Sequence, residues 1–372
     1  MRICILLGMD STAAGGTGDG PVDHVFDPRA FEGSAGTAAG PERVTEIGLR
    51  PANLEEFVGQ EPIVRNLRTH LGAAKGRGEP PDHVLFCGPP GLGKTSLARI
   101  LSEELGSELQ ATSGPALDKP RDLLGLLTNL NRGDVFFIDE IHRIPIAVEE
   151  YLYTAMEDFR VEMTLDTGPH ARVLPITVEP FTLVGATTRE GLLSAPFRAR
   201  FGLVERLDPY PPSDLVRILH RAAKILGVSL DDEGASLLAE RSRGTPRIAS
   251  RFLKRARDWA QVEGTTVIDG AMAATTLGNI GVDDQGLEEM DRRILRCLAD
   301  HLPRPAALKT IAAVIGETED TIEDVFEPHL LRTGLLQKTS RGRIITARGL
   351  EVIGRDPGEL TRAKGAGPLF DA

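Results

Sequence analysis

A glycine-rich segment between an apolar run and a helix-forming stretch constrains the fold of this chain more than any other feature. The segment Gly88–Thr95 reads GPPGLGKT, and it follows Val84–Cys87, which has the length and composition of a buried strand. A glycine-rich turn leaves backbone N–H groups free to converge on phosphate oxygens, and the next helix N-terminus adds positive potential. Lys94 then reaches the β- and γ-phosphates, and the Thr95 hydroxyl binds Mg²⁺. The segment therefore predicts a nucleotide-binding P-loop.

A second apolar run, Val135–Ile138, ends in an acidic pair suited to the same nucleotide. Asp139 is placed to hold the metal through water, and Glu140 is placed to orient or deprotonate an attacking water. The alternative is that two acidic residues merely close a core strand, and the P-loop upstream disfavours it. Together the two elements predict hydrolysis of ATP with Mg²⁺ as cofactor.

Composition and charge limit the number of domains, the kinds of partner and the location that this chain can have. With 372 residues, 41% of them hydrophobic, the chain is long enough for two or three domains with cores of their own. The formal charge of −11 means that nucleic acid contact requires a local basic patch. The wide spacing of Cys4, Cys87 and Cys297 argues against a zinc site or disulfide framework and favours a cytoplasmic location. The apolar run Ile3–Leu7 is too short for a signal peptide or a membrane span.

The chain divides into an extension, three blocks and a tail. Residues 1–45 lack a sustained apolar period, which predicts a flexible extension, either regulatory or dispensable. Residues 46–210 alternate strand-like and helical segments, which predicts a parallel sheet covered on both faces with ligands at the carboxyl ends of its strands. Residues 211–281 are helical, and residues 282–357 show the helix–helix–helix–hairpin pattern of a winged helix. Residues 358–372 form the tail.

The third helix predicted in the winged-helix block is acidic. Such a helix often enters the major groove of DNA, but here it would repel the phosphates. Its acidic residues are Glu317, Glu319, Asp320, Glu323, Asp324 and Glu327. The hairpin, or wing, instead carries Lys338, Arg341 and Arg343. We therefore expect the wing to contact nucleic acid, mainly its backbone. The alternative is that these cations only keep the hairpin soluble.

Eight short segments, in one collinear order over residues 49–354, resemble the RuvB family of AAA+ motors, which drive branch migration of Holliday junctions in bacteria. These segments are Leu49–Pro51, Val58–Gln60, Thr112–Pro115, Asp139–Arg143, Ala155–Phe159, Gly185–Arg189, Arg200–Gly202 and Arg243–Arg247. The resemblance implies an α/β fold: an AAA+ P-loop NTPase sheet domain with a small helical lid domain and a C-terminal winged-helix domain. It also implies an ATP-driven translocase of double-stranded DNA.

The resemblance assigns roles around the nucleotide. Phosphate contacts are implied for Gly91, Gly93, Lys94, Thr95 and Ser96. The adenine side is implied for Leu49, Arg50 and Tyr210, and a sensor in the lid for Arg247. Asp139 and Glu140 correspond to the Walker B pair, and the sensor after the next strand is Thr187 or, alternatively, Thr188. Glu157, Asp158 and Phe159 lie near the nucleotide in this family. Arg251 and Lys254, on the helix of Arg247, are expected to form a solvated face.

Assembly and partners are implied in the same way. Arg200 corresponds to an arginine finger donated to the neighbouring subunit's nucleotide, with Arg198 as its competitor. A finger supplied by the neighbouring copy makes a head-to-tail contact, and closing such contacts makes a ring. The family forms hexamers around duplex DNA. A predicted hairpin over Glu162–Val178 corresponds to the one that docks on the junction-binding partner RuvA, although an ordinary edge hairpin is the alternative. A RuvC-type resolvase is a further implied partner.

The chain departs from the family pattern at several positions. Ala199 stands where the family usually has an acidic residue, and Lys338 where an arginine is expected. Lysine keeps the charge but loses the bidentate fork, so it suits a point contact with phosphate. Two other functions stay open from the sequence: a clamp-loader-like switch that opens a protein ring, and a DNA-binding regulator that uses ATP only to change shape.

Overall fold

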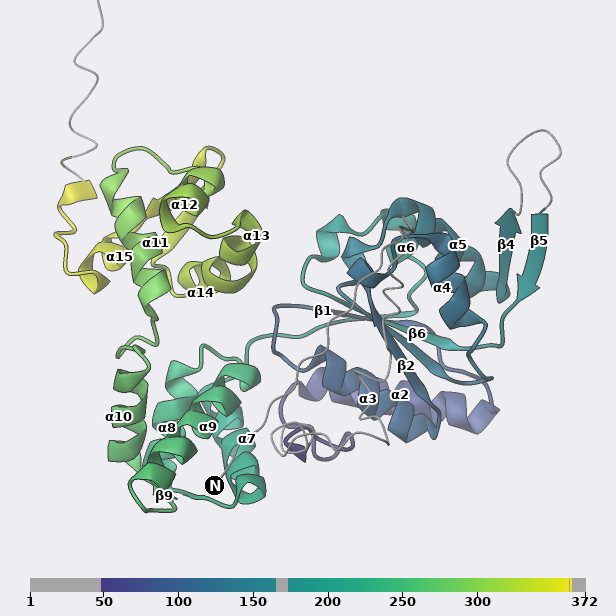
Figure 1. The fold of residues 1–372 in the computed structure, drawn as a ribbon, viewed down its shortest axis with the longest axis horizontal. Coiled ribbons are helices and arrows are strands. Elements are labelled where there is room, and N and C mark those ends of the chain that lie inside the picture. The colour runs from purple at the N-terminus through teal and green to yellow at the C-terminus, as the bar shows by residue number, and fades with distance from the viewer. Residues whose placement is uncertain (1–47, 165–172, 361, 363–372) are drawn as a thin grey trace, which may run out of the picture.

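A parallel sheet lies at the centre of the first domain in the computed structural model, which describes residues 48–164, 173–360 and 362 (Figure 1). Within these residues its five strands lie in the order β2-β3-β6-β1-β7. The strands are β1 (Val84–Cys87), β2 (Leu109–Ser113), β3 (Val135–Asp139), β6 (Thr182–Thr187) and β7 (Leu203–Arg206). The three inner strands are buried on both faces, which explains why their sequences are continuous apolar runs. The predicted parallel sheet is confirmed.

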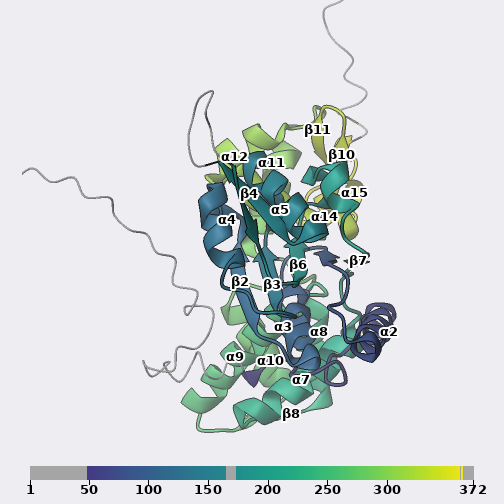
Figure 2. The same cartoon turned by 90° about the vertical axis from the view of Figure 1, so that its right-hand side faces the viewer.

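Helices cover both faces of this sheet (Figure 2). Helices α2 (Glu61–Arg77) and α3 (Lys94–Leu105) pack on one face, and α4 (Pro120–Leu127) and α5 (Ile146–Asp158) pack on the other. Successive strand residues point to opposite faces, so Phe136 belongs to one hydrophobic core and Phe137 to the other. The short helix α6 (Ala195–Arg198) precedes β7.

The predicted hairpin projects from the edge of this domain (Figure 1). Strands β4 (Arg160–Thr164) and β5 (Val173–Thr177) pair antiparallel, with Glu162 opposite Pro175. They form a sheet of their own, and β4 begins two residues before the predicted start at Glu162. Residues 165–172, within the predicted hairpin, lie outside the described residues.

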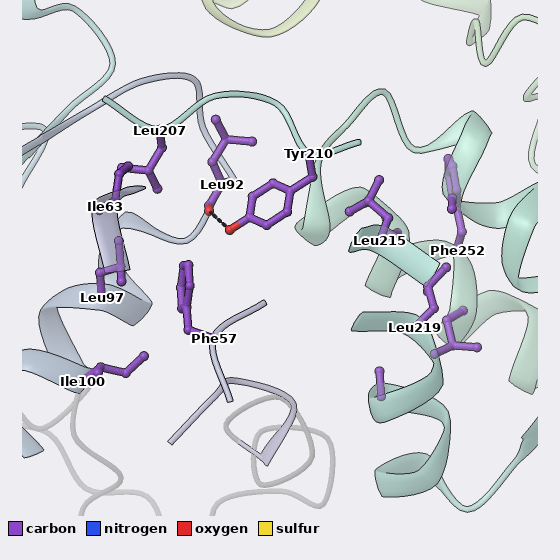
Figure 3. Close-up of a cluster of buried hydrophobic side chains, with 14 of the residues drawn as sticks. Phe57, Ile63, Leu92, Leu97, Ile100, Leu207, Tyr210, Leu215, Leu219 and Phe252 are labelled. Carbon is purple, nitrogen blue, oxygen red and sulfur yellow. Dashed lines mark hydrogen bonds between the residues drawn. The ribbon is translucent and has the colours of Figure 1, made fainter. Parts of the chain in front are cut away.

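The second domain is the predicted helical lid. Its helices are α7 (Pro212–Leu226), α8 (Asp232–Arg241), α9 (Pro246–Val262) and α10 (Gly270–Asn279), with a short parallel pair β8 (Ser229–Leu230) and β9 (Val267–Ile268). Prolines at the first turns of α7 and α9 are preorganised for helix starts, and Gly227 ends α7 in the left-handed region. Figure 3 shows that Leu215, Leu219 and Phe252 of the lid continue the core formed by Phe57 and Leu97 of the first domain. The lid therefore packs directly against the P-loop domain.

The third domain has the predicted winged-helix pattern. It contains α11 (Glu289–Asp300), α12 (Leu308–Ile315), α13 (Glu319–Thr321), α14 (Glu327–Arg332), the hairpin β10 (Leu336–Thr339) and β11 (Gly342–Ile345), and α15 (Ala347–Val352). A π-helical turn over Ile322–Phe326 joins α13 to α14 into the third helix, which Thr318 caps. Pro328 explains this turn, because it has no N–H to donate to the Asp324 carbonyl and so interrupts the α-helical hydrogen bonds. Just before it, the Glu327 N–H bonds the Ile322 carbonyl, five residues back, which is the π-helical pattern.

The lid and the winged-helix domain lie one above the other beside the sheet domain (Figure 1). The predicted extension over residues 1–45 lies outside the described residues, as does most of the predicted tail over residues 358–372. Among the residues described, no helix is long and apolar enough to cross a membrane.

Candidate functional site

A pocket of about 410 Å³ lies at the carboxyl ends of the parallel strands, between the sheet domain and the lid. It brings together every residue predicted to bind phosphate, adenine or metal on one subunit. These residues are Leu49, Arg50, Gly91, Gly93, Lys94, Thr95, Ser96, Asp139, Glu140, Tyr210 and Arg247. Arg251 and Lys254, which are predicted to form a solvated face, also line this pocket. The pocket has the size range of small-molecule sites and an unusually charged lining.

The P-loop contacts the lid directly at Gly91. This glycine has φ 81°, and a Cβ there would lie 2.8 Å from the Thr245 methyl group and 3.0 Å from the Arg247 Cβ. The Arg247 backbone N–H donates to the Gly91 carbonyl at 3.4 Å. Lys94 Nζ donates to the carbonyls of Gly88 (2.7 Å) and Pro89 (2.9 Å). Burial lowers the pKa of Lys94, while Glu140 and Asp139 raise it.

The adenine side is built around the buried Tyr210. Its hydroxyl donates to the Leu92 carbonyl at 3.1 Å (Figure 3), and burial raises its pKa. A Cβ at Gly59 would lie 2.8 Å from the Tyr210 ring, so this position in the Val58–Gln60 motif requires glycine. Arg221 donates to the Leu49 carbonyl at 2.9 Å and holds the N-terminal segment against the lid.

The acidic pair ends β3 in a strained turn. Glu140 has φ 48°, in the left-handed region that few residues other than glycine adopt. A Cβ at Gly114 would lie 2.3 Å from the Glu140 carbonyl oxygen, so the turn fits only because residue 114 is glycine. The Glu140 N–H donates to Asp139 Oδ1 at 3.0 Å, and burial raises the pKa of Asp139.

The donors at this end of β3 fit a magnesium ion. Asp139 supplies a carboxylate and Thr95 a hydroxyl to the same pocket, and Mg²⁺ prefers such oxygen ligands. No group of three or more His, Cys, Asp or Glu within the described ranges has the geometry of a metal site. Mg²⁺ bound with a nucleotide takes most ligands from phosphates and water, so one carboxylate and one hydroxyl suffice.

The two candidate sensor threonines at the end of β6 have different surroundings. Thr187 is fully buried, and its Oγ1 lies 3.0 Å from His142 Nδ1 and accepts the Arg189 N–H at 3.0 Å. Thr188 donates from Oγ1 to Glu140 Oε2 at 3.1 Å. Burial lowers the pKa of His142, which favours its neutral form. Thr188 therefore contacts the Glu140 carboxylate directly, whereas Thr187 contacts His142.

Arg200 lies outside this pocket on another surface of the sheet domain. Its guanidinium lies 4.4 Å from the Tyr153 ring centroid, with Nε 3.2 Å from a Glu157 oxygen, and Nη1 donates to the Pro196 carbonyl at 2.9 Å. Its competitor Arg198 pairs with Glu190 at 3.4 Å. Asp158 and Phe159, like Glu157, are absent from the pocket lining.

The three cations of the wing differ in exposure. Arg343 is buried, and its Nη2 donates to Glu327 of α14 at 2.8 Å, so its side chain faces the third helix rather than solvent. Lys338 is half-exposed and donates to Glu323 at 2.9 Å. The Arg341 side chain is exposed at the tip of the hairpin. The wing therefore presents Arg341 and Lys338 to solvent.

Three family models match the chain in succession. They describe the Holliday junction DNA helicase RuvB P-loop domain (residues 49–207), the RuvB AAA lid domain (210–283) and the RuvB C-terminal winged helix domain (284–354). The chain belongs to the RuvB family. The Holliday junction branch migration complex subunit RuvB of Chlorobium luteolum is 54% identical over 306 residues, 82% of this chain and 89% of that protein. The RuvB subunit of Myxococcus xanthus is 54% identical over 319 residues, 85% of this chain and 93% of that protein.

A solved RuvB structure has the same fold. The Thermotoga maritima RuvB Holliday junction branch migration motor matches with a TM-score of 0.76 and 46% identity, covering 83% of this chain and 99% of that chain. Membership of the RuvB family confirms the P-loop ATPase fold and the resemblance that the sequence motifs indicated.

Proposed function

We propose that this chain is an ATP-driven translocase of double-stranded DNA that powers branch migration of Holliday junctions. The observation that carries the proposal is the convergence of the P-loop, the Asp139–Glu140 pair and Arg247 of the lid on one pocket, in a chain that matches all three RuvB domain models. Loss of the γ-phosphate would remove contacts with both the sheet domain and the lid, so hydrolysis would rotate the lid relative to the sheet domain.

The residues of the pocket divide the chemistry among them. Lys94 neutralises charge on the β- and γ-phosphates, and Thr95 and Asp139 would hold Mg²⁺, which when bound stabilises negative charge on the phosphate oxygens. Glu140 orients and deprotonates the attacking water. We propose Thr188 rather than Thr187 as the sensor, because its hydroxyl reaches the Glu140 carboxylate.

Arg200 acts on the nucleotide of a neighbouring copy in this proposal. It lies outside the pocket of its own chain, and Tyr153 and Glu157 hold its guanidinium in place. Asp158 and Phe159 follow Glu157 in the chain, and α5 ends at Asp158. Repeating such a head-to-tail contact around a closed ring gives the proposed homohexamer.

The DNA and protein partners would use other surfaces. Arg341 and Lys338 would grip the phosphate backbone, which makes translocation independent of sequence and sensitive to salt, while Arg343 would fix the wing to the third helix through Glu327. The β4–β5 hairpin, where Leu174 is 46% exposed, would dock a RuvA-type junction-binding protein. A RuvC-type resolvase would cleave the migrated junction, and the work would take place in the cytoplasm.

A junction dissociation assay tests this function. The full chain is mixed with ATP, Mg²⁺, a RuvA-type protein and a synthetic four-way junction. We expect the junction to separate into duplex arms, and the ATPase rate to rise when duplex DNA is added. The Glu140→Gln variant should bind the junction without separating it. Sequence-selective DNA binding with little ATP turnover would contradict the proposal and favour a regulator. ATP-dependent opening of a protein ring without junction dissociation would favour a clamp-loader-like switch.

A further inference from the structure

Arg189 joins the segment after β6 to the winged-helix domain. Its guanidinium makes a bidentate contact with Asp324, from Nε to Oδ1 and from Nη2 to Oδ2 at 2.8 Å each. Nη2 also donates to Asp320 at 3.0 Å and lies 3.7 Å from Glu323. These hydrogen bonds to carboxylates raise the pKa of Arg189, so it carries its charge at any working pH. The acidic third helix, unsuited to DNA, therefore has a cationic partner within the same chain.

The other end of this contact reaches the catalytic carboxylate. Arg189 directly follows Thr188, which donates to Glu140, and its own N–H donates to Thr187, which lies beside His142. One hydrogen bond thus links the Glu140 carboxylate to Thr188, the residue before Arg189, and a second ties the Arg189 N–H to Thr187. A shift of Glu140 would therefore move the backbone that carries the Arg189 side chain.

The wing is connected to the same ion pairs. Glu323 lies 3.7 Å from Arg189, accepts from Lys338 at 2.9 Å and accepts from Arg343 at 3.3 Å. Glu323 and Asp324 both lie in the π-helical turn, a distortion often found at functional positions of helices. Phosphates that attract Lys338 would therefore weaken its hold on Glu323, one of the carboxylates facing Arg189.

A second connection fixes the winged-helix domain to the lid. Arg243 of the lid pairs with Asp291 of α11 at 2.6 Å, and both side chains are buried. Arg243 also donates to the Gly286 carbonyl at 2.9 Å, and its own carbonyl accepts from Arg332 at 2.5 Å. Breaking a buried ion pair strands charges away from water, whereas the partners of Arg189 are partly exposed and can be rehydrated. The Arg189 connection is therefore the easier of the two to open.

We infer that Arg189 is a positioning residue that ties the orientation of the winged-helix domain to the state of the nucleotide site. When Glu140 and Thr188 shift on hydrolysis, Arg189 releases Asp324 and Asp320, and the winged-helix domain moves together with the lid. This inference rests on the proposed function, since it names the contact through which the ATPase site would control the DNA-gripping domain.

The Asp324→Asn variant tests the inference, because it removes one charge from a residue that contacts neither the pocket nor Glu140. Glu319→Gln is the matched control: it removes the same charge from the same helix, and Glu319 is exposed and does not contact Arg189. Two quantities are measured: junctions dissociated per ATP hydrolysed, and the distance between spin labels on the sheet domain and on the winged-helix domain with ADP and with a slowly hydrolysed ATP analogue.

We expect Asp324→Asn to keep its DNA-free ATPase rate within about twofold of the unmodified chain, and to lose at least about tenfold in junctions dissociated per ATP. Its label distance should become the same with both nucleotides, while Glu319→Gln behaves like the unmodified chain. The double exchange Arg189→Asp with Asp324→Arg should restore part of the yield. Unchanged yield and unchanged distances in Asp324→Asn would overturn the inference while leaving the proposed function intact. Failure of the unmodified chain to dissociate junctions would overturn the proposed function itself.

Discussion

Gly114→Ala is the substitution that most sharply tests how the catalytic turn is held. The added Cβ would lie 2.3 Å from the Glu140 carbonyl oxygen and 3.2 Å from its carbon, and both are backbone atoms that cannot rotate away. Separating them to 3.0 Å requires a shift of about 0.7 Å in the turn that carries Glu140. A displacement of roughly 1 Å at a reacting group costs on the order of 10²-fold in rate. Overpacking of this kind also costs about 1–3 kcal/mol of unfolding free energy.

The assay compares steady-state ATPase rate, nucleotide affinity and urea unfolding for the unmodified chain and Gly114→Ala. We expect kcat to fall about 10²-fold with nucleotide binding retained, because the P-loop itself is untouched. Gly125→Ala is the control, since its Cβ on the exposed face of α4 meets no atom within 4 Å. That change should leave kcat unaltered and stabilise the protein by about 0.5–1 kcal/mol. A normal kcat in Gly114→Ala would refute the idea that this contact positions Glu140.

Three further predictions concern charge. Lys94→Ala should abolish ATP turnover, measured as phosphate release, because it removes the charge facing the phosphates; a rate near that of the unmodified chain would show that another cation does this work. The pKa of the buried His329 is lowered to about 3, so below pH 6.5 the unfolded chain binds a proton that the folded chain does not. Unfolding free energy should therefore fall by about 2 kcal/mol between pH 7 and pH 5, and a His329→Gln variant should lack this component in urea titrations; equal pH slopes would contradict the assignment. Asp291→Asn should cost about 3–5 kcal/mol by stranding Arg243, whereas the exposed Glu289→Gln should change stability by less than about 0.5 kcal/mol in the same titration.

Local sequence patterns predicted much of the fold and of the pocket. The P-loop, the buried strand before it and the acidic pair after β3 are each encoded within about ten residues, and local steric and hydrophobic rules suffice to interpret them. The hairpin strands around Glu162 and the helical character of residues 211–281 were found in the same way. Residues that approach each other at the carboxyl ends of parallel strands follow from the topology alone.

Local sequence patterns could not predict contacts between residues that lie far apart in the chain. The pairing of Arg189 with Asp324 joins residues 135 positions apart, and nothing in the acidic third helix alone indicates its partner. The burial of the Arg343 side chain depends on Glu327 from α14, so a count of charges in the hairpin could not distinguish the buried Arg343 from the exposed Lys338. The choice between adjacent threonines, Thr187 and Thr188, depends on which hydroxyl reaches Glu140, and spacing cannot resolve that.

In the proposed mechanism each nucleotide is cleaved by residues from two copies of the chain, and mixing two inactive variants measures this directly. Arg200→Ala and Glu140→Gln are each expected to lose roughly 10³-fold or more in ATPase rate. In an equal mixture that assembles at random, about one quarter of the head-to-tail sites combine an intact Glu140 with an intact Arg200 from the neighbour. We expect ATPase activity to return toward that fraction of the unmodified rate. A mixture no more active than the two variants measured apart, or full activity of Arg200→Ala alone, would contradict it.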